Sequence, residues 1–522
     1  MGRALETELK FELDAAAAKA LGEHLQFKTL GRPHQLRSVY YDTPETDLRD
    51  HGLTLRVRDD GKRRVQTVKK SVLGGNGFHR GEWENLLAPR AAGDLSPDLD
   101  AAALTPLSEI LNRRELAFVR PIFEVEIKRI TRSVEIDGAI IEIALDRGCA
   151  RAEDRRAPIG EVELELKAGS PRALFALARD CSAVAPLELC FISKAARGYA
   201  LLDEADPAAA PATDPRLRPK DTAGEAFRAI AGAALTQISA NARMLKTARA
   251  PAALHQLRVG VRRLRSAISM FAPMLADDGL NGVKAELKWL AGELNEARDL
   301  DVFLQDTFRP ALERDPGQIG LKGFGDRLST ARERAYDRAE AAIQPPRFHA
   351  LMLNSLAWVE AGDWCLGDDS VHTALRDRPI AAVAAEEFAV RWRKIVKQGR
   401  HLEAMAPAER HQLRIKVKRL RYACGFFGGL YSGKAAKAHK AFAIAARDLQ
   451  DGLGALTDIA FSHDLVARVA GLGGDPAMLQ KDGAEQAFAA GALVGQAAAP
   501  TGKRLKAAVK AHRALRDAKP FW

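Results

Sequence analysis

Residues 161–167 read Glu-Val-Glu-Leu-Glu-Leu-Lys, with charged and apolar side chains in strict alternation. A period of two places the charged residues on one face of a β-strand and the apolar residues on the other. The same alternation occurs at residues 6–11 and 53–58 and, in part, at 140–146. The first part of the chain is therefore predicted to form an antiparallel sheet. Helices are expected between strands at residues 15–22 and 171–184.

The sequence DPAAAPATDPRLRPKD occupies residues 206–221 and contains four regularly spaced prolines. Proline fixes φ and removes a hydrogen-bond donor, so this segment is predicted to be a linker. It separates a first domain at 1–205 from a second at 222–515. In the second domain the apolar residues recur with a period of 3.6, which predicts an all-α fold.

The charge of the chain is divided unevenly between these two parts. The net charge is +11, made up of −4 in residues 1–215 and +15 in residues 216–522. A basic second half suggests an anionic partner. The five cysteines include no CxxC spacing, which argues against a disulfide framework and favours a reducing compartment. No apolar leader and no apolar stretch of about 20 residues is present, so we expect a cytoplasmic protein without a membrane partner.

Charged faces recur on several of the predicted strands. Glu6, Glu8 and Lys10 share one strand face, and the pairs Arg56/Arg58 and Glu82/Glu84 follow the same spacing. For any single strand, a solvated outer face explains the pattern. A closed sheet could instead turn these faces inward and line a wet lumen. Carboxylates opposite Lys and Arg would suit a divalent metal ion together with a phosphate chain.

The motifs of this half, taken in order, resemble the CYTH family of triphosphate tunnel metalloenzymes. Glu6-x-Glu8-x-Lys10 is similar to the ExExK signature of that family, and the later segments follow in the family's order over residues 1–203. They are Tyr40–Pro44, Leu53–Arg58, Thr67–Lys69, Arg80–Glu84, Ile143–Gly148, Glu161–Glu165 and Ser193–Tyr199. The resemblance implies an α+β domain built on an eight-stranded antiparallel β-barrel, whose lumen binds a linear triphosphate with Mg²⁺ or Mn²⁺.

The resemblance also implies a role for particular residues. Triphosphate would be bound by Lys10, Arg56, Arg58, Lys69, Arg129 and Lys194. Metal would be held by Glu6, Glu8, Asp146, Glu163 and Glu165. Catalytic roles would fall to Lys69, Glu6 and Glu8. Whether Lys69 or a carboxylate acts as the base is left open, and so is the number of metal ions that bind. Arg129 and Arg132 both fit one family position but have opposite strand parity, so only one can face inward, and we expect Arg129.

The second half contains a repeated basic segment. Residues 255–271 read HQLRVGVRRLRSAISMF and residues 411–427 read HQLRIKVKRLRYACGFF. Such a repeat predicts two copies of one helical unit. The basic residues of each copy form a stripe at helical spacing, and we call these the two basic stripes. They are His255, Arg258, Arg262 and Arg265 in the first copy, and His411, Arg414, Lys418 and Arg421 in the second.

These segments resemble the CHAD domain, a helical module of two four-helix repeats. The resemblance implies that the basic stripes bind inorganic polyphosphate. From the residues alone, two facing stripes predict a cleft for a polyanion, and two solvated helix faces are the alternative.

We expect a two-domain enzyme that hydrolyses inorganic triphosphate to diphosphate and phosphate and binds polyphosphate through its second domain. Association with polyphosphate granules would follow from that binding. The alternatives are a polyphosphate-docking scaffold, and a nucleotide triphosphatase, thiamine triphosphatase or cyclase. Nucleic-acid binding is disfavoured because the stripes lack interleaved aromatic residues, apart from Tyr422.

Overall fold

The structure is a computed structural model of the 522-residue chain. It describes residues 3–24, 33–70, 78–88, 94–203, 208–367, 370–470, 481–498 and 501–522. The chain divides into two compact units. The first contains residues 1–210, 235–240 and 344–366, and the second contains residues 211–234, 241–343 and 367–522.

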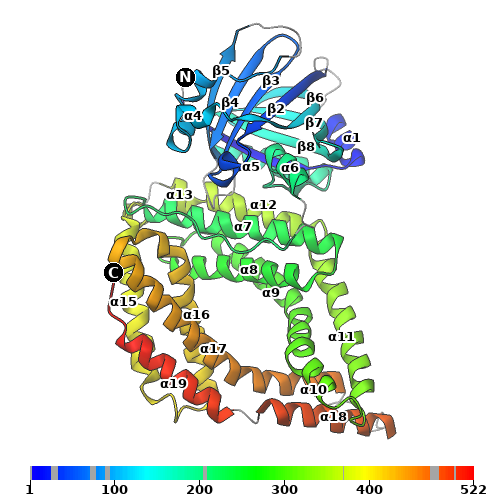
Figure 1. The fold of residues 1–522 in the computed structure, drawn as a ribbon, viewed down its shortest axis with the longest axis vertical. Helices are drawn as coiled ribbons and strands as arrows, with labels where there is room; N and C mark the ends of the chain where they lie inside the picture. The colour runs from blue at the N-terminus through cyan, green and yellow to red at the C-terminus, as the bar shows by residue number, and fades with distance from the viewer. Residues whose placement is uncertain are drawn as a thin grey trace. The chain divides into compact units, whose positions relative to one another are not determined.

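Eight antiparallel strands of the first unit close into a barrel (Figure 1). The strand order is β5-β4-β3-β2-β6-β7-β8-β1, and a further pairing between β1 and β5 closes the ring. A short ninth strand, β9, pairs antiparallel with the last two residues of β1. The strands are β1 (Arg3–Glu12), β2 (His34–Asp42), β3 (Leu53–Asp59), β4 (Arg64–Lys70), β5 (His79–Leu87), β6 (Arg120–Ile136), β7 (Ala139–Ala152), β8 (Arg155–Ala168) and β9 (Glu188–Leu189). The predicted barrel is thereby confirmed.

The alternation along each strand determines which side chains enter the lumen. On β3, Leu55 and Val57 are fully buried on the outer face, where they join an apolar core with residues from the 95–116 segment. Arg56 and Arg58 point the other way and line the lumen. The helices of this part are α1 (Ala15–His24), α2 (Asp47–Asp50), α3 (Leu99–Ala102), η2 (Pro106–Glu109), α4 (Arg113–Leu116), α5 (Pro171–Val184) and α6 (Lys194–Leu202).

Helix α6 packs against an apolar layer inside one part of the barrel. Tyr199 is buried in one cluster with Tyr40 and Phe123, and its ring meets Phe123 edge-on at 5.1 Å between centroids. Its hydroxyl donates to Asp42 at 2.7 Å. This packing fixes the first turn of α6, which carries Lys194, against the ionic part of the lumen.

Two helices from far along the chain also belong to the first unit. They are α12 (Arg347–Ala361) and α13 (Asp363–Leu366), and α12 packs on α5 and β9. Arg179 of α5 donates to Asn354 at 2.9 Å, and Arg172 pairs with Asp363 at 2.5 Å.

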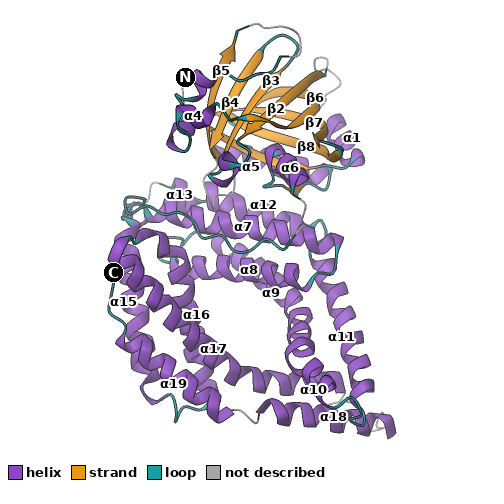
Figure 2. Ribbon diagram, viewed as in Figure 1, coloured by secondary structure: helices purple, strands orange, loops and turns teal. Residues whose placement is uncertain are grey.

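The second unit is helical in its described residues (Figure 2). Two sets of four long helices follow one another, α7-α8-α9-α11 and α15-α16-α17-α19. In each set the second helix packs on the third and the third on the fourth, which is the predicted duplication. The helices are α7 (Ala223–Thr247), α8 (Pro251–Met270), α9 (Gly279–Phe303), η3 (Leu304–Phe308), α10 (Arg309–Arg314), α11 (Leu321–Ala342), α14 (Ser370–Arg376), α15 (Ile380–Gln398), η4 (Gly399–His401), α16 (Pro407–Phe427), η5 (Gly428–Leu430), α17 (Gly433–Ala470), α18 (Lys481–Ala498) and α19 (Thr501–Asp517).

The proline-rich segment packs on the second unit where it is described. Leu217 is buried, and Asp214 accepts a 2.6 Å hydrogen bond from Arg263. The expected domain end at residue 205 lies outside the described residues. Among the helices of the described residues, none combines the length and apolarity needed to cross a membrane.

Candidate functional site: the barrel lumen and the paired basic helices

The lumen of the barrel holds a strongly charged cavity of about 200 Å³. Of its 19 lining residues, eight are Lys or Arg and seven are Glu. These charged side chains come from seven strands and helix α6, and most of them are alternate residues of β1, β3, β5 and β8, so the wall is set by strand parity. The charged residues are Glu6, Glu8, Lys10, Arg56, Arg58, Lys69, Arg80, Glu82, Glu84, Arg129, Glu142, Glu163, Glu165, Lys167 and Lys194, and the remaining four are Tyr40, Thr54, Ser193 and Ala195.

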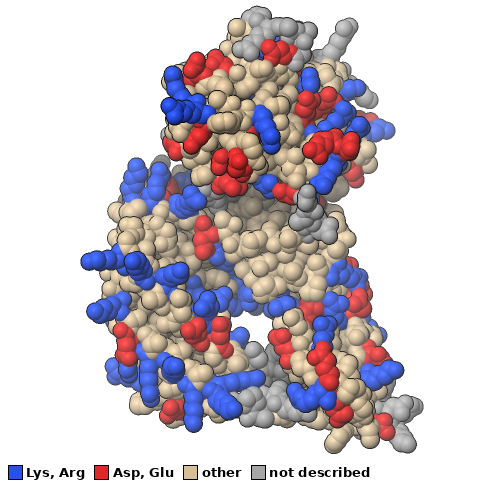
Figure 3. All heavy atoms as spheres, viewed as in Figure 1, with Lys and Arg blue, Asp and Glu red and all other residues tan. Residues whose placement is uncertain are grey.

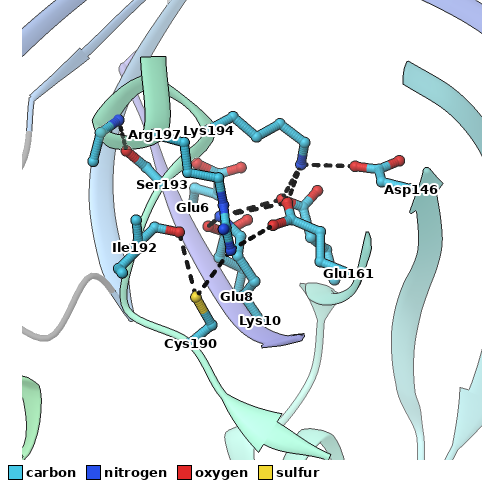
Figure 4. Close-up of polar contacts among 12 residues, drawn as sticks. Glu6, Glu8, Lys10, Asp146, Glu161, Cys190, Ile192, Ser193, Lys194 and Arg197 are labelled. Carbon is cyan, nitrogen blue, oxygen red and sulfur yellow. Dashed lines mark hydrogen bonds and ion pairs between the residues drawn. The ribbon is translucent and has the colours of Figure 1, made fainter. Parts of the chain in front are cut away.

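One ionic cluster is centred on Lys194 (Figure 4). The Lys194 ammonium lies 2.7 Å from Asp146 and 2.8 Å from Glu163, and it also contacts Glu161. Arg129 donates to Asp146 through two nitrogens, at 2.7 and 2.6 Å, and to Glu163 at 2.5 Å. Oxygen atoms of Asp146, Glu161 and Glu163 lie within 4.8 Å of one another.

The cations of this cluster keep its carboxylates ionised. Burial alone would raise the pKa of Asp146 and Glu163, but Lys194 and Arg129 outweigh it and lower both pKa values. The same carboxylates raise the pKa of Lys194 above its usual value, although burial opposes this. The charges of the cluster therefore largely neutralise one another. Asp146 belongs to the wall of the barrel and is not among the residues that line the cavity.

A second group of lumen carboxylates is paired with lysines of β4 and β8. Lys69 lies 2.6 Å from Glu6 and 3.1 Å from Glu82. Lys167 lies 2.7 Å from Glu165. Burial raises the pKa of Glu165 and Lys167 opposes this, but the Glu6 and Glu142 carboxylates add to the burial, and the pKa stays raised. Closely spaced carboxylates that repel one another offer the hard oxygen ligands that a divalent cation takes.

Guanidinium groups crowd together on the strand β3 side of the cavity. Arg56, then burial, then Arg129 lower the pKa of Arg58 to about 10. Arg58 forms an ion pair with the Glu84 carboxylate, at 3.7 Å. Within the described residues, the buried Nε of Arg56 has no hydrogen-bond partner. Crowded guanidinium groups of this kind favour an anion with several oxygens.

All but one of the residues predicted for the lumen line the same cavity. Glu6, Glu8, Lys10, Arg56, Arg58, Lys69, Arg129, Glu163, Glu165 and Lys194 all line the cavity, and Asp146 lies behind its wall. Arg129 lies on the lumen face, and Arg132 is not among the lining residues. Sequence reasoning assigned no role to Glu161, Arg80, Glu142 and Lys167. Strand parity was the signal that could have included them, since Glu161 shares a face with Glu163 and Lys167 with Glu165.

The two basic stripes approach each other in the helical unit, where α8 packs on α16. Lys418 of α16 lies near Arg258 and Arg262 of α8, as well as Arg414 and Arg421 of its own helix. Burial first, and then these cations, lower the pKa of Lys418 to about 7. Lys and Arg side chains are also prominent on the visible surface over α15 and α19 (Figure 3).

The stripe residues differ in exposure and in partners. Burial and the neighbouring Arg298 lower the pKa of His255 to about 4. Arg258 is partly neutralised, because it lies 3.4 Å from Asp299 and donates to Asn295 at 2.8 Å. Arg262, Arg414 and Lys418 are half-buried, and the outer members Arg265, His411 and Arg421 are exposed.

A closed barrel with a charged lumen, followed by a duplicated helical unit with facing basic helices, defines the class of protein. Residues 4–199 match the family model of the CYTH domain, and residues 229–467 match that of the CHAD domain. The chain is thus a CYTH domain fused to a CHAD domain, as its motifs predicted.

Known relatives cover one or the other domain. An inorganic triphosphatase of Haemophilus influenzae is 28% identical over 199 residues, which are 38% of this chain and 54% of the relative. The chain therefore spans about half the length of that curated relative. The CHAD domain from Ricinus communis is 29% identical and covers 61% of this chain and 99% of its own, with a TM-score of 0.49. A putative adenylyl cyclase from Hippeastrum, described as having a dominant triphosphatase activity, is 17% identical with a TM-score of 0.31, over 37% of this chain and 95% of its own.

Proposed function

We propose that the barrel hydrolyses inorganic triphosphate to diphosphate and phosphate with Mg²⁺ or Mn²⁺. The observation that carries this proposal is the composition of the lumen, in which 15 of 19 lining residues are charged, eight of them Lys or Arg and seven of them Glu. A neutral or singly charged substrate could form ionic contacts with few of these groups. The matching inorganic triphosphatase and the CYTH family support the same substrate class.

In this proposal the cations of the lumen hold the phosphate chain. Arg56, Arg58 and Arg129 offer forked donors to phosphate oxygens, and Lys10, Lys69 and Lys194 add compact charges. Neutralising the triphosphate lowers the repulsion that an attacking water oxygen would meet. Binding in an extended form would also align the water with the bond that breaks.

The carboxylate side of the lumen fits a divalent cation. Glu6, Glu8 and Glu165 would hold it, and a cation beside Glu165 would offset the burial and the Glu6 and Glu142 carboxylates that raise the pKa of Glu165. Asp146 and Glu163 would act mainly by orienting Lys194 and Arg129, with which they are already paired. When bound, such a cation polarises phosphate oxygens and makes water a better nucleophile.

Lys69 fits the role of a cation better than that of a base. Burial alone would lower the pKa of Lys69, but Glu6, Glu8 and Glu82 outweigh it and raise the pKa above its usual value. The ammonium therefore stays protonated at neutral pH, where it can stabilise negative charge on the triphosphate. A lumen carboxylate, Glu6 or Glu8, remains as the base.

A substrate panel tests the proposed activity. Purified protein is incubated with tripolyphosphate, ATP, thiamine triphosphate or long-chain polyphosphate, each with Mg²⁺ and Mn²⁺, and phosphate release is measured. We expect tripolyphosphate to give the highest kcat/KM. Preference for ATP with release of diphosphate would instead identify a cyclase, and inactivity toward all four would leave a docking scaffold.

We further propose that the paired basic stripes bind inorganic polyphosphate. The convergence of four arginines around Lys418 supports this, because such a cluster is unfavourable unless an anion neutralises it. Fluorescence anisotropy with labelled polyphosphate and labelled duplex DNA tests the proposal at two salt concentrations. We expect tighter binding of polyphosphate, a steep loss with salt, and strong weakening when Arg262, Arg265, Lys418 and Arg421 are replaced together. Tighter binding of DNA, or wild-type affinity in the fourfold variant, would contradict it.

A further inference from the structure

The pairing of β1 with β5 that closes the barrel ends at Thr7 and His79. Residues Arg3–Thr7 of β1 pair with Trp83–His79 of β5, and Phe11 and Glu12 of β1 pair with β9. The Glu8 amide donates to Phe78 at 3.1 Å, and Lys10 accepts from the Cys190 amide at 2.8 Å. We call this end of the pairing, formed by Glu8 and Lys10 of β1 with Phe78 and Arg80 at the start of β5, the β1–β5 seam.

Helix α12 lies behind the seam. Leu356 of α12 is 1% exposed and lines a small cavity together with Glu8, Lys10, Phe78 and Arg80. Of these, Glu8, Lys10 and Arg80 also line the main cavity of the lumen. A side chain of α12 is therefore separated from the proposed metal and phosphate site by one layer of residues.

A chain of polar contacts joins the seam to the same helix. Thr7 and His79 are paired across β1 and β5 on the outer face of the barrel. The Thr7 hydroxyl lies 3.0 Å from His79 Nδ1, and His79 Nε2 lies 3.6 Å from a carboxylate oxygen of Glu360. Glu360 is 4% exposed, at the end of α12.

These outer residues are sequence neighbours of lumen residues. Thr7 lies between Glu6 and Glu8, and His79 precedes Arg80. Because side chains alternate along a strand, fixing Thr7 and His79 on the outside fixes the direction of the lumen carboxylates and of Arg80, which lies 3.2 Å from Glu8. Outer contacts that orient ligands of a site commonly change its affinity when they are removed.

We propose that α12 is a positioning element of the tunnel, acting through Glu360, His79 and Leu356 on the seam that presents Glu6, Glu8 and Arg80. The inference rests on the proposed triphosphatase function. It gives part of the segment matched by the CHAD model a role in the first unit, since α12 belongs to residues 344–366 of that unit.

Full-length variants test the positioning role. Glu360→Ala removes the carboxylate, Glu360→Gln keeps a hydrogen-bonding group of the same size, and His79→Asn keeps an amide near Thr7 while losing the reach to Glu360. Asn354→Ala is the matched control, because exposed Asn354 bonds to Arg179 of α5, away from the seam. The readouts are kcat and KM for tripolyphosphate, Mn²⁺ binding by calorimetry without substrate, and thermal unfolding.

We expect E360A and H79N to weaken Mn²⁺ binding about tenfold and to lower kcat by a similar factor, with KM changed less. E360Q should recover most of the loss, and N354A should match the wild type in all readouts except a slightly lower Tm. Folded E360A and H79N with wild-type kcat and Mn²⁺ affinity would overturn the proposal, as would equal losses in N354A. Calorimetry separates the two proposals, because Mn²⁺ binding is measured without hydrolysis. A wild-type protein that does not hydrolyse tripolyphosphate would contradict only the proposed function.

Discussion

At the scale of the residue, the lumen depends on pairs of opposite charge and on which face of a strand each member occupies. Arg129 shows this most clearly, since it binds Asp146 and Glu163 at once and its partners keep it charged. Arg132, three residues further along β6, lies outside the cavity lining. The two arginines thus occupy opposite faces of β6 through strand parity.

Replacing each arginine by glutamine tests that difference. R129Q should lower kcat/KM for tripolyphosphate about 10–100-fold, because a charge-assisted contact to phosphate contributes roughly 1.5–3 kcal/mol. R132Q should retain activity within about twofold. Steady-state kinetics and thermal unfolding of both proteins provide the comparison, and an R132Q variant more impaired than R129Q would show that the inward residue has been assigned incorrectly.

Lys418 gives a prediction for pH. In the free protein its pKa is about 7, so the ammonium loses its proton as the pH rises above 7. A phosphate beside it would favour the charged form, and binding must then take up a proton, so polyphosphate affinity should fall by up to about tenfold per pH unit between pH 7 and 9. Lys418→Arg, which stays charged, should flatten this dependence. Parallel pH curves for both proteins in anisotropy titrations would rule out Lys418 as the titrating group.

At the scale of the element, single helices and strands carry the functional groups to one another. Helix α6 brings Lys194 to the ionic cluster, and its position depends on close packing at Gly198. A Cβ atom on Gly198 would lie 2.1 Å from the Phe123 ring. The helix can therefore approach β6 only with glycine at this position.

Gly198→Ala should consequently displace α6 and move Lys194 away from Asp146 and Glu163. We expect a loss of about 1–3 kcal/mol in unfolding free energy from overpacking, together with lower triphosphatase activity. Gly282→Ala is the control, because a Cβ there meets nothing within 4 Å and alanine is the better helix former by about 1 kcal/mol. Denaturant unfolding measures both, and a G198A protein as stable and active as G282A would show that α6 tolerates the shift.

Strand and helix elements were largely predictable from the sequence because their periodicity is local. The alternation at 161–167 and the repeat at 255–271 and 411–427 both appear in the structure as expected elements. Tertiary pairing was less predictable. Glu161 shares the alternating face, yet only the fold shows that it contacts Lys194.

At the scale of the whole molecule, the two units do not follow one cut in the sequence. The helical segment at 344–366 clusters with the first unit, although it lies inside the range matched by the CHAD model. Periodicity could not have revealed this, because an apolar helix such as α12 shows that it is buried but not which residues cover it.

The central claim is that a divalent cation held by the carboxylates of the lumen supports cleavage of triphosphate. Phosphorus NMR of the full chain with tripolyphosphate, with Mg²⁺ or with a chelator, tests it most directly, alongside Glu6→Gln. We predict equal amounts of diphosphate and phosphate from the wild type with Mg²⁺, and almost none with the chelator or in folded E6Q, because both remove the cation or one of its ligands. Hydrolysis that persists with the chelator, or that E6Q retains at the wild-type rate, would contradict the account.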